Sequence, residues 1–229
     1  MLVMLTRMIA ITIPLVIGTP TTSMAEAGSE NTIQGEITII KRNEKEKKYR
    51  SNVVIFLDQV ESDTPFIAPP ENPKVSQRAR RFRPRTLPVL KNTSVDFPND
   101  DRVMHNVYSL SKIKPFDLGV YKKGETKTIT FDKPGIAKVY CNIHSNMVMN
   151  VLVLNNPFFT STDSHGQFKL AGIPNGSYLL RIWHEYGDEI SKEITLSGGE
   201  IQEHLFTLQE TTTFIQHKNK YGNPYGDKY

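Results

Sequence analysis

The stretch VYCNIHSNMVMNVLVL, residues 139–154, contains the only cysteine of the 229-residue chain. Cys141, His144 and Met147 follow one another at steps of three, and an alternation of residues that is typical of a β-strand comes after them. The run IAKVYC that leads to the cysteine has the same strand-like alternation. We therefore expect Cys141 and Met147 to point inward across one turn, with His144 at its tip.

The N-terminus has the pattern of an export signal. Arg7 precedes the short apolar run MIAITIPLVIG, and SMA at 23–25 is a small-residue cleavage site. The apolar run is too short for a membrane-spanning helix, and no later stretch is apolar for long enough. We expect residues 1–25 to be a signal peptide, with an uncleaved anchor as the alternative. The mature protein is then periplasmic or secreted, with no integral membrane span.

A single cysteine is unusual in an exported protein, because exported proteins normally pair their cysteines in disulfides. Cys141 is therefore a buried small hydrophobic residue, half of an intermolecular disulfide, or a metal ligand. A thiolate bound to a metal is held and protected from oxidation. A thiolate, an imidazole and a thioether together suit copper better than magnesium or calcium. Copper sites with one Cys, two His and a weak axial Met transfer electrons, but this loop supplies only one histidine.

Five other histidines could supply the second imidazole. His105 follows a predicted strand and a polar turn in FPNDDRVMHNVYS, where a neighbouring strand can present it to the same end of a sandwich. We therefore predict His105 as a ligand. The remaining histidines are expected to be structural or exposed; they are His165, His184, His204 and His217.

The net charge of +4 is too small to indicate nucleic-acid binding. One local cluster, RARRFRPR at 78–85, contains five arginines. We favour an exposed strand with outward charges, and the alternative is a docking patch for an acidic partner or a lipid surface. Three carboxylates have no partner visible in the sequence and are expected to be solvated: Asp100, Asp101 and Glu185.

The order of short segments predicts an all-β chain of sandwiches. Runs rich in Val, Ile, Thr, Tyr and Phe are separated by Gly, Pro, Asn and Asp, with almost no helical periodicity. TIQGEITII (32–40) and SNVVIFLDQ (51–59) predict two strands joined by a charged turn, and the Pro-rich segment 61–74 predicts a linker. Residues 210–229 lack apolar spacing at their end and are predicted to be a disordered tail.

The segments PNDDRVMHNV and YCNIHSNMVMNVLVL together resemble the blue copper proteins, or cupredoxins, of the plastocyanin and amicyanin type. The resemblance covers about residues 75–154. It implies a Greek-key β-sandwich that binds one copper ion, and Asn106 as a brace for the cysteine loop. The ligands that it implies are His105, Cys141, His144 and Met147. Met149 fits a longer loop spacing, and Ile143 stands where the family often has proline.

A second resemblance concerns FFTSTDSHGQFKLAGIPNGSYLLRIWHE, which is similar to the carboxypeptidase regulatory-like (transthyretin-like) sandwich. The apolar strands that open such domains are present before the copper segment. We therefore expect the cupredoxin domain to be inserted into a second small β-sandwich formed by 32–62 and 155–209. In the alternative arrangement, the first strands belong to the copper domain. The resemblance implies adhesion or architecture for the second sandwich.

The expected function is that of a periplasmic type 1 copper protein that carries single electrons between redox protein partners. No Ser-His-Asp, His-Glu-x-x-His or phosphate-loop motif is present, so we do not expect an enzyme. The residues next to Cys141 are Tyr140 and Asn142, so we expect no oxygen-reducing copper cluster. The alternatives are a copper delivery or storage protein and a metal-free structural module. The oligomeric state stays open.

Overall fold

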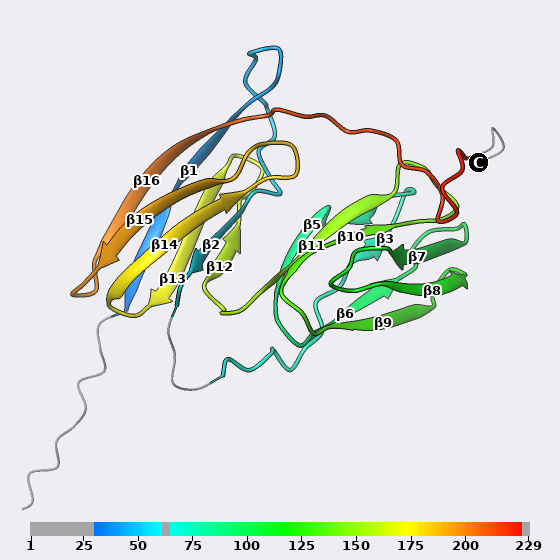
Figure 1. Cartoon of the computed structure of the whole chain (residues 1–229), viewed down its shortest axis with the longest axis horizontal. Helices are drawn as coiled ribbons and strands as arrows, with labels where there is room; N and C mark the ends of the chain where they lie inside the picture. The colour runs from blue at the N-terminus through cyan, green and yellow to red at the C-terminus, as the bar shows by residue number, and fades with distance from the viewer. Residues whose placement is uncertain (1–29, 61–64, 226–229) are drawn as a thin grey trace, which may run out of the picture.

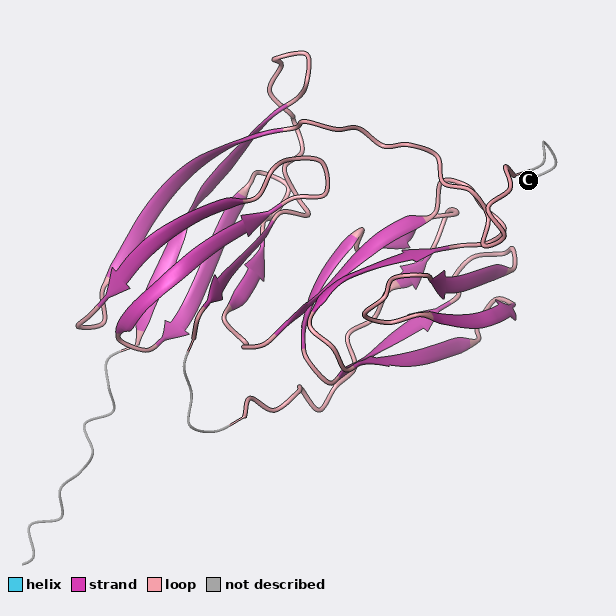
Figure 2. Cartoon of the chain, viewed as in Figure 1, coloured by secondary structure: helices cyan, strands magenta, loops and turns pink. Residues whose placement is uncertain are grey.

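The computed structural model describes residues 30–60 and 65–225, which contain β-strands and loops but no α-helix (Figure 2). The predicted all-β class is therefore confirmed for these residues. The predicted signal peptide, 1–25, lies outside the described residues. Within the described ranges, there is also no apolar helix of membrane-spanning length.

Strands from two distant parts of the sequence form two facing sheets at one end of the molecule (Figure 1). These strands are β1 (Asn31–Ile40), β2 (Val54–Asp58), β12 (Phe159–Ser161), β13 (Gln167–Ile173), β14 (Gly176–Trp183), β15 (Ile190–Leu196) and β16 (Ile201–Gln209). One sheet has the order β13-β1-β16, and the other has the order β12-β2-β14-β15. The strands that precede the cysteine loop therefore pair with strands that follow it.

The two sheets of this first sandwich share an apolar core. Alternate residues of β1, Ile33, Ile37 and Ile39, are completely buried, as expected for a strand with one face on the core. They pack with Leu57 of β2 and with apolar residues of β13 to β16. Gly35 sits where β1 and β16 run closest, since a Cβ there would lie 1.8 Å from the backbone oxygen of His204. Only glycine allows this approach of the two backbones.

The middle of the chain forms a second group of sheets. Its strands are β3 (Ser76–Gln77), β4 (Phe82–Arg83), β5 (Thr86–Leu90), β6 (Thr93–Pro98), β7 (His105–Ser109), β8 (Phe116–Tyr121), β9 (Thr126–Phe131), β10 (Gly135–Tyr140) and β11 (Val148–Leu154). The main sheet has the order β5-β11-β10-β7-β8, while β6 pairs with β9 and β3 pairs with β4. All the predicted copper ligands belong to this group.

Strand β11 is buried on both faces because it has packing partners on both. Met149, Val151 and Val153 lie in the core of the second group, together with Val139 of β10. Leu152 points the other way and joins a small buried cluster with residues of β2. The cysteine loop is thus attached to a strand that is held by both halves of the molecule.

Residues 210–225, part of the segment predicted to be a disordered tail, contact the second group of sheets. After β16 the chain crosses to the second group of sheets, where it runs past the cysteine loop (Figure 1). Tyr225 donates its hydroxyl hydrogen to the backbone oxygen of Cys141 at 2.7 Å, and the N–H of Lys220 donates to Oδ1 of Asn142 at 2.8 Å. The segment is polar and is held by hydrogen bonds. A search of the sequence for apolar spacing does not detect such contacts. Residues 226–229 lie outside the described residues.

Candidate metal centre

The cysteine loop is a short connection between β10 and β11. Cys141 comes directly after β10, and its N–H donates to the backbone oxygen of Met147 at 3.0 Å. The N–H of Met147 in turn donates to the backbone oxygen of His144 at 3.1 Å, which closes a tight turn. His105 is the first residue of β7, the strand next to β10 in the sheet. Sheet pairing therefore brings His105 to the end of the sheet where the loop lies.

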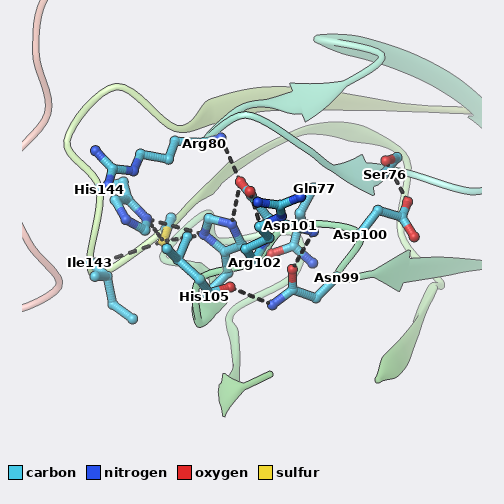
Figure 3. A network of polar contacts seen from close by, with 12 residues as sticks. Ser76, Gln77, Arg80, Asn99, Asp100, Asp101, Arg102, His105, Ile143 and His144 are labelled. Carbon is cyan, nitrogen blue, oxygen red and sulfur yellow. Dashed lines mark hydrogen bonds and ion pairs between the residues drawn. The ribbon is translucent and has the colours of Figure 1, made fainter. Parts of the chain in front are cut away.

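Three of the predicted ligands meet in one cluster. Nδ1 of His105 lies 3.1 Å from Nδ1 of His144, and Sγ of Cys141 lies 3.9 Å and 3.6 Å from these two atoms. The rings of the two histidines approach edge to face (Figure 3). His105 and Cys141 are completely buried, and His144 is 7% exposed. The His-Cys-His grouping is thus a buried triangle of donor atoms.

The dimensions of this triangle fit a single metal ion. A point equidistant from the two nitrogens and the sulfur lies about 2.1 Å from each. Zinc, for comparison, lies about 2.0–2.1 Å from histidine nitrogen and about 2.3 Å from cysteine sulfur. The two Nδ1 atoms also face each other, so their lone pairs repel unless a proton or a cation lies between them. The three residues can therefore hold a metal ion without rearrangement of their backbone.

The strand register brings Met147 closer to Cys141 than Met149. Tyr140 pairs with Val148, and Val139 pairs with Met149. The backbone hydrogen bond from Cys141 to Met147 continues the same register, so these two residues lie opposite each other. Directly opposite residues in antiparallel strands point to the same face. Met147 and Met149 are both completely buried in the cluster that contains Cys141, so it is the register that makes Met147 the better candidate for a fourth donor.

Burial keeps both histidines neutral at neutral pH. It lowers the pKa of His144 to about 4, and repulsion from Arg80, and from His105 whenever that ring is protonated, acts in the same direction. It also lowers the pKa of His105, although a hydrogen bond and charge attraction from Asp101 oppose this effect. Burial raises the pKa of Cys141, while backbone N–H groups that point at the sulfur partly offset it. Neutral imidazoles leave their lone pairs available for a metal ion, which would displace the thiol proton.

Backbone and amide groups hold the loop in place around the sulfur. The N–H of Ile143 points at Sγ of Cys141 at 3.4 Å. Oδ1 of Asn106 accepts the N–H of Asn142 at 3.3 Å, and Nδ2 of Asn106 donates to Oδ1 of Asp117 at 2.6 Å. The amide of Asn106 therefore joins β7 to the cysteine loop, as the sequence resemblance implies.

Asp101 is a residue of the site that the sequence does not reveal. Its Oδ2 lies 3.2 Å from Nε2 of His105 (Figure 3), so it accepts the hydrogen of that nitrogen and leaves Nδ1 free to face Cys141. Burial raises the pKa of Asp101, but hydrogen bonds from Arg80, His105 and Arg102 outweigh it and lower the pKa overall. The expectation of a solvated carboxylate is wrong for this residue, because the turn before β7 folds back onto His105.

The expectation of solvation also fails for Glu185, which pairs with Arg85 at 2.7 Å and has a side chain that is only 9% exposed. It holds for Asp100, which is exposed and accepts a hydrogen bond from Ser76 at 2.6 Å.

The other four histidines lie outside the cluster. His165 is exposed, and His204 is partly buried in β16. His184 is buried in the first sandwich, where its Nδ1 accepts the N–H of Tyr186 at 3.3 Å. His217 packs against the ring of Tyr140 with a centroid distance of 4.7 Å. None of the four belongs to the metal-binding group formed by the described residues.

Comparisons with known proteins give partial structural matches only. No protein-family model and no curated protein matches the chain. A purple cupredoxin from Nitrosopumilus maritimus is 25% identical over 36% of this chain and all of its own, with a TM-score of 0.34. A reduced variant of amicyanin is 20% identical over 44% of this chain and 98% of its own, with a TM-score of 0.35. A copper-containing nitrite reductase from Thermus scotoductus is 25% identical over 42% of this chain and 25% of its own, with a TM-score of 0.37.

Proposed function

We propose that residues 75–154 form a cupredoxin-type copper domain that carries single electrons, with His105, Cys141, His144 and Met147 as ligands. The observation that carries the proposal is the buried triangle of two Nδ1 atoms and one Sγ, whose dimensions fit one metal ion. A bound copper ion would supply a one-electron couple. The chain supplies the donor atoms, their orientation and the exclusion of water.

The donor set favours copper over other metals. Hard oxygen-binding ions such as magnesium and calcium do not prefer a thiolate with two imidazoles. A structural zinc site is normally closed by four strong ligands, whereas the fourth donor available beside Cys141 is the thioether of Met147. Two histidines, one cysteine and a weak axial methionine are the donors of electron-transfer copper sites.

The way the ligands are held favours electron transfer over copper delivery. His105 belongs to β7, and the other ligands lie between β10 and β11, so separate strands of one sheet fix the set. Three of the four ligands are completely buried. Asp101 holds the ring of His105, and Asn106 holds the cysteine loop. The positions of rigid, buried ligands change little when the metal gains or loses one electron. A delivery protein needs ligands that exchange their metal quickly.

The test is an optical and electron paramagnetic resonance spectrum of the copper-loaded protein. We expect one copper per chain and an intense visible thiolate-to-copper band. The variant Cys141→Ser should lose the band, while Met149→Leu should keep it. A colourless Cu(I) complex that loses its metal to a chelator within minutes would favour delivery instead. Absence of stoichiometric copper in the folded wild type would leave a structural module.

The proposal also covers the cellular compartment of the copper domain and the second sandwich that surrounds it in the sequence. The N-terminal sequence supports export to the periplasm or beyond, where the domain would exchange electrons with a redox protein partner. The pairing of β1 and β2 with β12 to β16 supports an arrangement in which the copper domain is inserted into a second sandwich formed by 32–62 and 155–209. That sandwich would have an architectural or adhesive role.

A further inference from the structure

A cleft of about 1120 Å³ lies beside the proposed copper site. One wall is the arginine segment of residues 79–85, and another is the tip of the cysteine loop with His144. Tyr49 and Asn52, from the segment before β2, line the same cleft. It therefore opens between the first sandwich and the second group of sheets.

The arginines of this cleft form a concentrated positive surface. Arg80, Arg81 and Arg83 line the cleft and are exposed. Arg85 is neutralised by Glu185, but no carboxylate among the described residues forms a salt bridge with the other three. Unpaired charges of one sign in a cleft attract a partner of the opposite sign and speed its association.

His144 gives this cleft access to the metal centre. It is the one proposed ligand that lines the cleft and the one with any exposed surface, since His105, Cys141 and Met147 are completely buried. Arg80 lies beside the ring of His144 (Figure 3), close enough for its charge to act on the imidazole. An electron that leaves the site through His144 would therefore enter the arginine cleft.

The arginine turn has a strained backbone and is joined by a hydrogen bond to a residue beside the proposed metal site. Arg78 and Arg81 exchange backbone hydrogen bonds of 3.0 and 3.2 Å around a two-residue turn, in which Ala79 and Arg80 have φ of 53° and 54°. Such turns favour glycine and asparagine, and other residues cost about 1 kcal/mol or more in this conformation. The N–H of Arg80 donates to Oδ2 of Asp101 at 2.8 Å, the oxygen that also contacts His105. Strain that persists because a neighbouring site fixes it is typical of functional segments.

We propose that the arginine cleft docks an acidic surface of a protein redox partner and brings that partner's redox centre next to His144. The exchange moves one electron between the two proteins, so one is oxidised as the other is reduced, and no bond forms or breaks. A protruding acidic loop can enter the concave site, which a flat lipid surface cannot. The redox part of this inference rests on the proposed function, whereas the acidic docking surface does not.

The first test uses the metal-free protein and poly-L-glutamate as the acidic probe, with binding measured by isothermal titration calorimetry. We expect the wild type to bind and its affinity to fall with added salt. Arg81→Glu combined with Arg83→Glu should weaken binding about tenfold or more, and the milder Arg81→Gln with Arg83→Gln should weaken it in the same direction. Lys169→Glu with Lys192→Glu is the matched control, because both lysines are exposed in the first sandwich and neither lines the cleft.

Equal weakening in the arginine and lysine variants would overturn the proposal, since net charge alone would explain it. Arginine-dependent binding to phosphatidylserine vesicles without binding to poly-L-glutamate would also overturn it, in favour of a lipid surface.

The second test uses the copper-loaded protein and compares an anionic oxidant, hexacyanoferrate(III), with a cationic one, tris(phenanthroline)cobalt(III), by stopped flow. The glutamate variant should slow the anionic oxidant and speed the cationic one, with the visible band unchanged. Unchanged rates with both would contradict docking beside His144. A wild type that binds poly-L-glutamate through its arginines but binds no copper would instead contradict the proposed function and leave the acidic docking site standing.

Discussion

Nε2 of His105 lies 3.2 Å from Oδ2 of Asp101, and the same carboxylate oxygen accepts the backbone N–H of Arg80 at 2.8 Å. One carboxylate therefore orients a proposed metal ligand and the arginine turn at the same time. It fixes the hydrogen of His105 on Nε2, so that Nδ1 faces Cys141. Carboxylates in this position commonly strengthen the histidine as a metal ligand.

Replacing Asp101 with alanine should weaken copper binding about 10- to 100-fold, because His105 then loses the group that sets its tautomer and ring orientation. Competition with a chromogenic copper chelator measures this change. Asp100→Ala is the matched control, since the exposed Asp100 contacts Ser76 and not a ligand. If the two alanine variants bound copper equally well, Asp101 would have no role in positioning His105.

Replacing Met147 with leucine should raise the reduction potential of the copper protein, because the more highly charged copper state loses a donor. The same change at Met149 should leave the potential nearly unchanged, since Met149 lies opposite Val139 and not opposite Cys141. Both methionines are completely buried, and this swap conserves volume, so each variant should lose less than about 1.5 kcal/mol of unfolding free energy. Protein-film voltammetry gives the potentials. If the reduction potential shifted in Met149→Leu and not in Met147→Leu, Met149 would be the copper ligand in place of Met147.

The cluster of His105, Cys141 and His144 could be predicted because each of the three residues carries a signal within its own segment. The spacing of Cys141 and His144 fixes two donors on one turn, and His105 comes where a polar turn gives way to a strand. Strand alternation also predicts which face of β10 is buried, and Ala137 and Val139 are indeed on the core face with Cys141.

Contacts that depend on how turns and polar segments fold back could not be predicted in this way. Asp101 contacts His105 only because the preceding turn folds back, and the spacing of four residues is uninformative outside a helix. Tyr225 reaches Cys141 through hydrogen bonds in a polar segment that has no hydrophobic periodicity. Strand β11 is buried on both faces because Leu152 packs against β2, which depends on how the two groups of strands meet.

Stability should fall as the pH drops because His184 is buried in neutral form. Burial in the first sandwich lowers the pKa of His184 to about 4, whereas an unfolded histidine has a pKa of about 6.5. The stabilisation is thus complete above about pH 6.5 and is lost as the pH falls towards 4. The difference amounts to about 3 kcal/mol at most.

Urea unfolding of the metal-free protein between pH 4 and pH 8 measures this dependence. The variant His184→Gln should lose part of the pH dependence, whereas His165→Gln, at an exposed position, should keep the slope of the wild type. Parallel curves for His184→Gln and the wild type would show that protonation of His184 does not limit stability in acid.

The C-terminal segment should hold the cysteine loop through Tyr225. Its hydroxyl donates to the backbone oxygen of Cys141 at 2.7 Å and lies 3.2 Å from Nδ1 of His217. Tyr225→Phe removes this donor and should lower the unfolding free energy by about 0.5–1.5 kcal/mol. It should also speed hydrogen exchange at the amide of Lys220, which donates to Asn142 in the loop. Tyr221→Phe is the matched control, because Tyr221 is 73% exposed. Equal exchange at Lys220 in the two variants would mean that the segment is held without Tyr225.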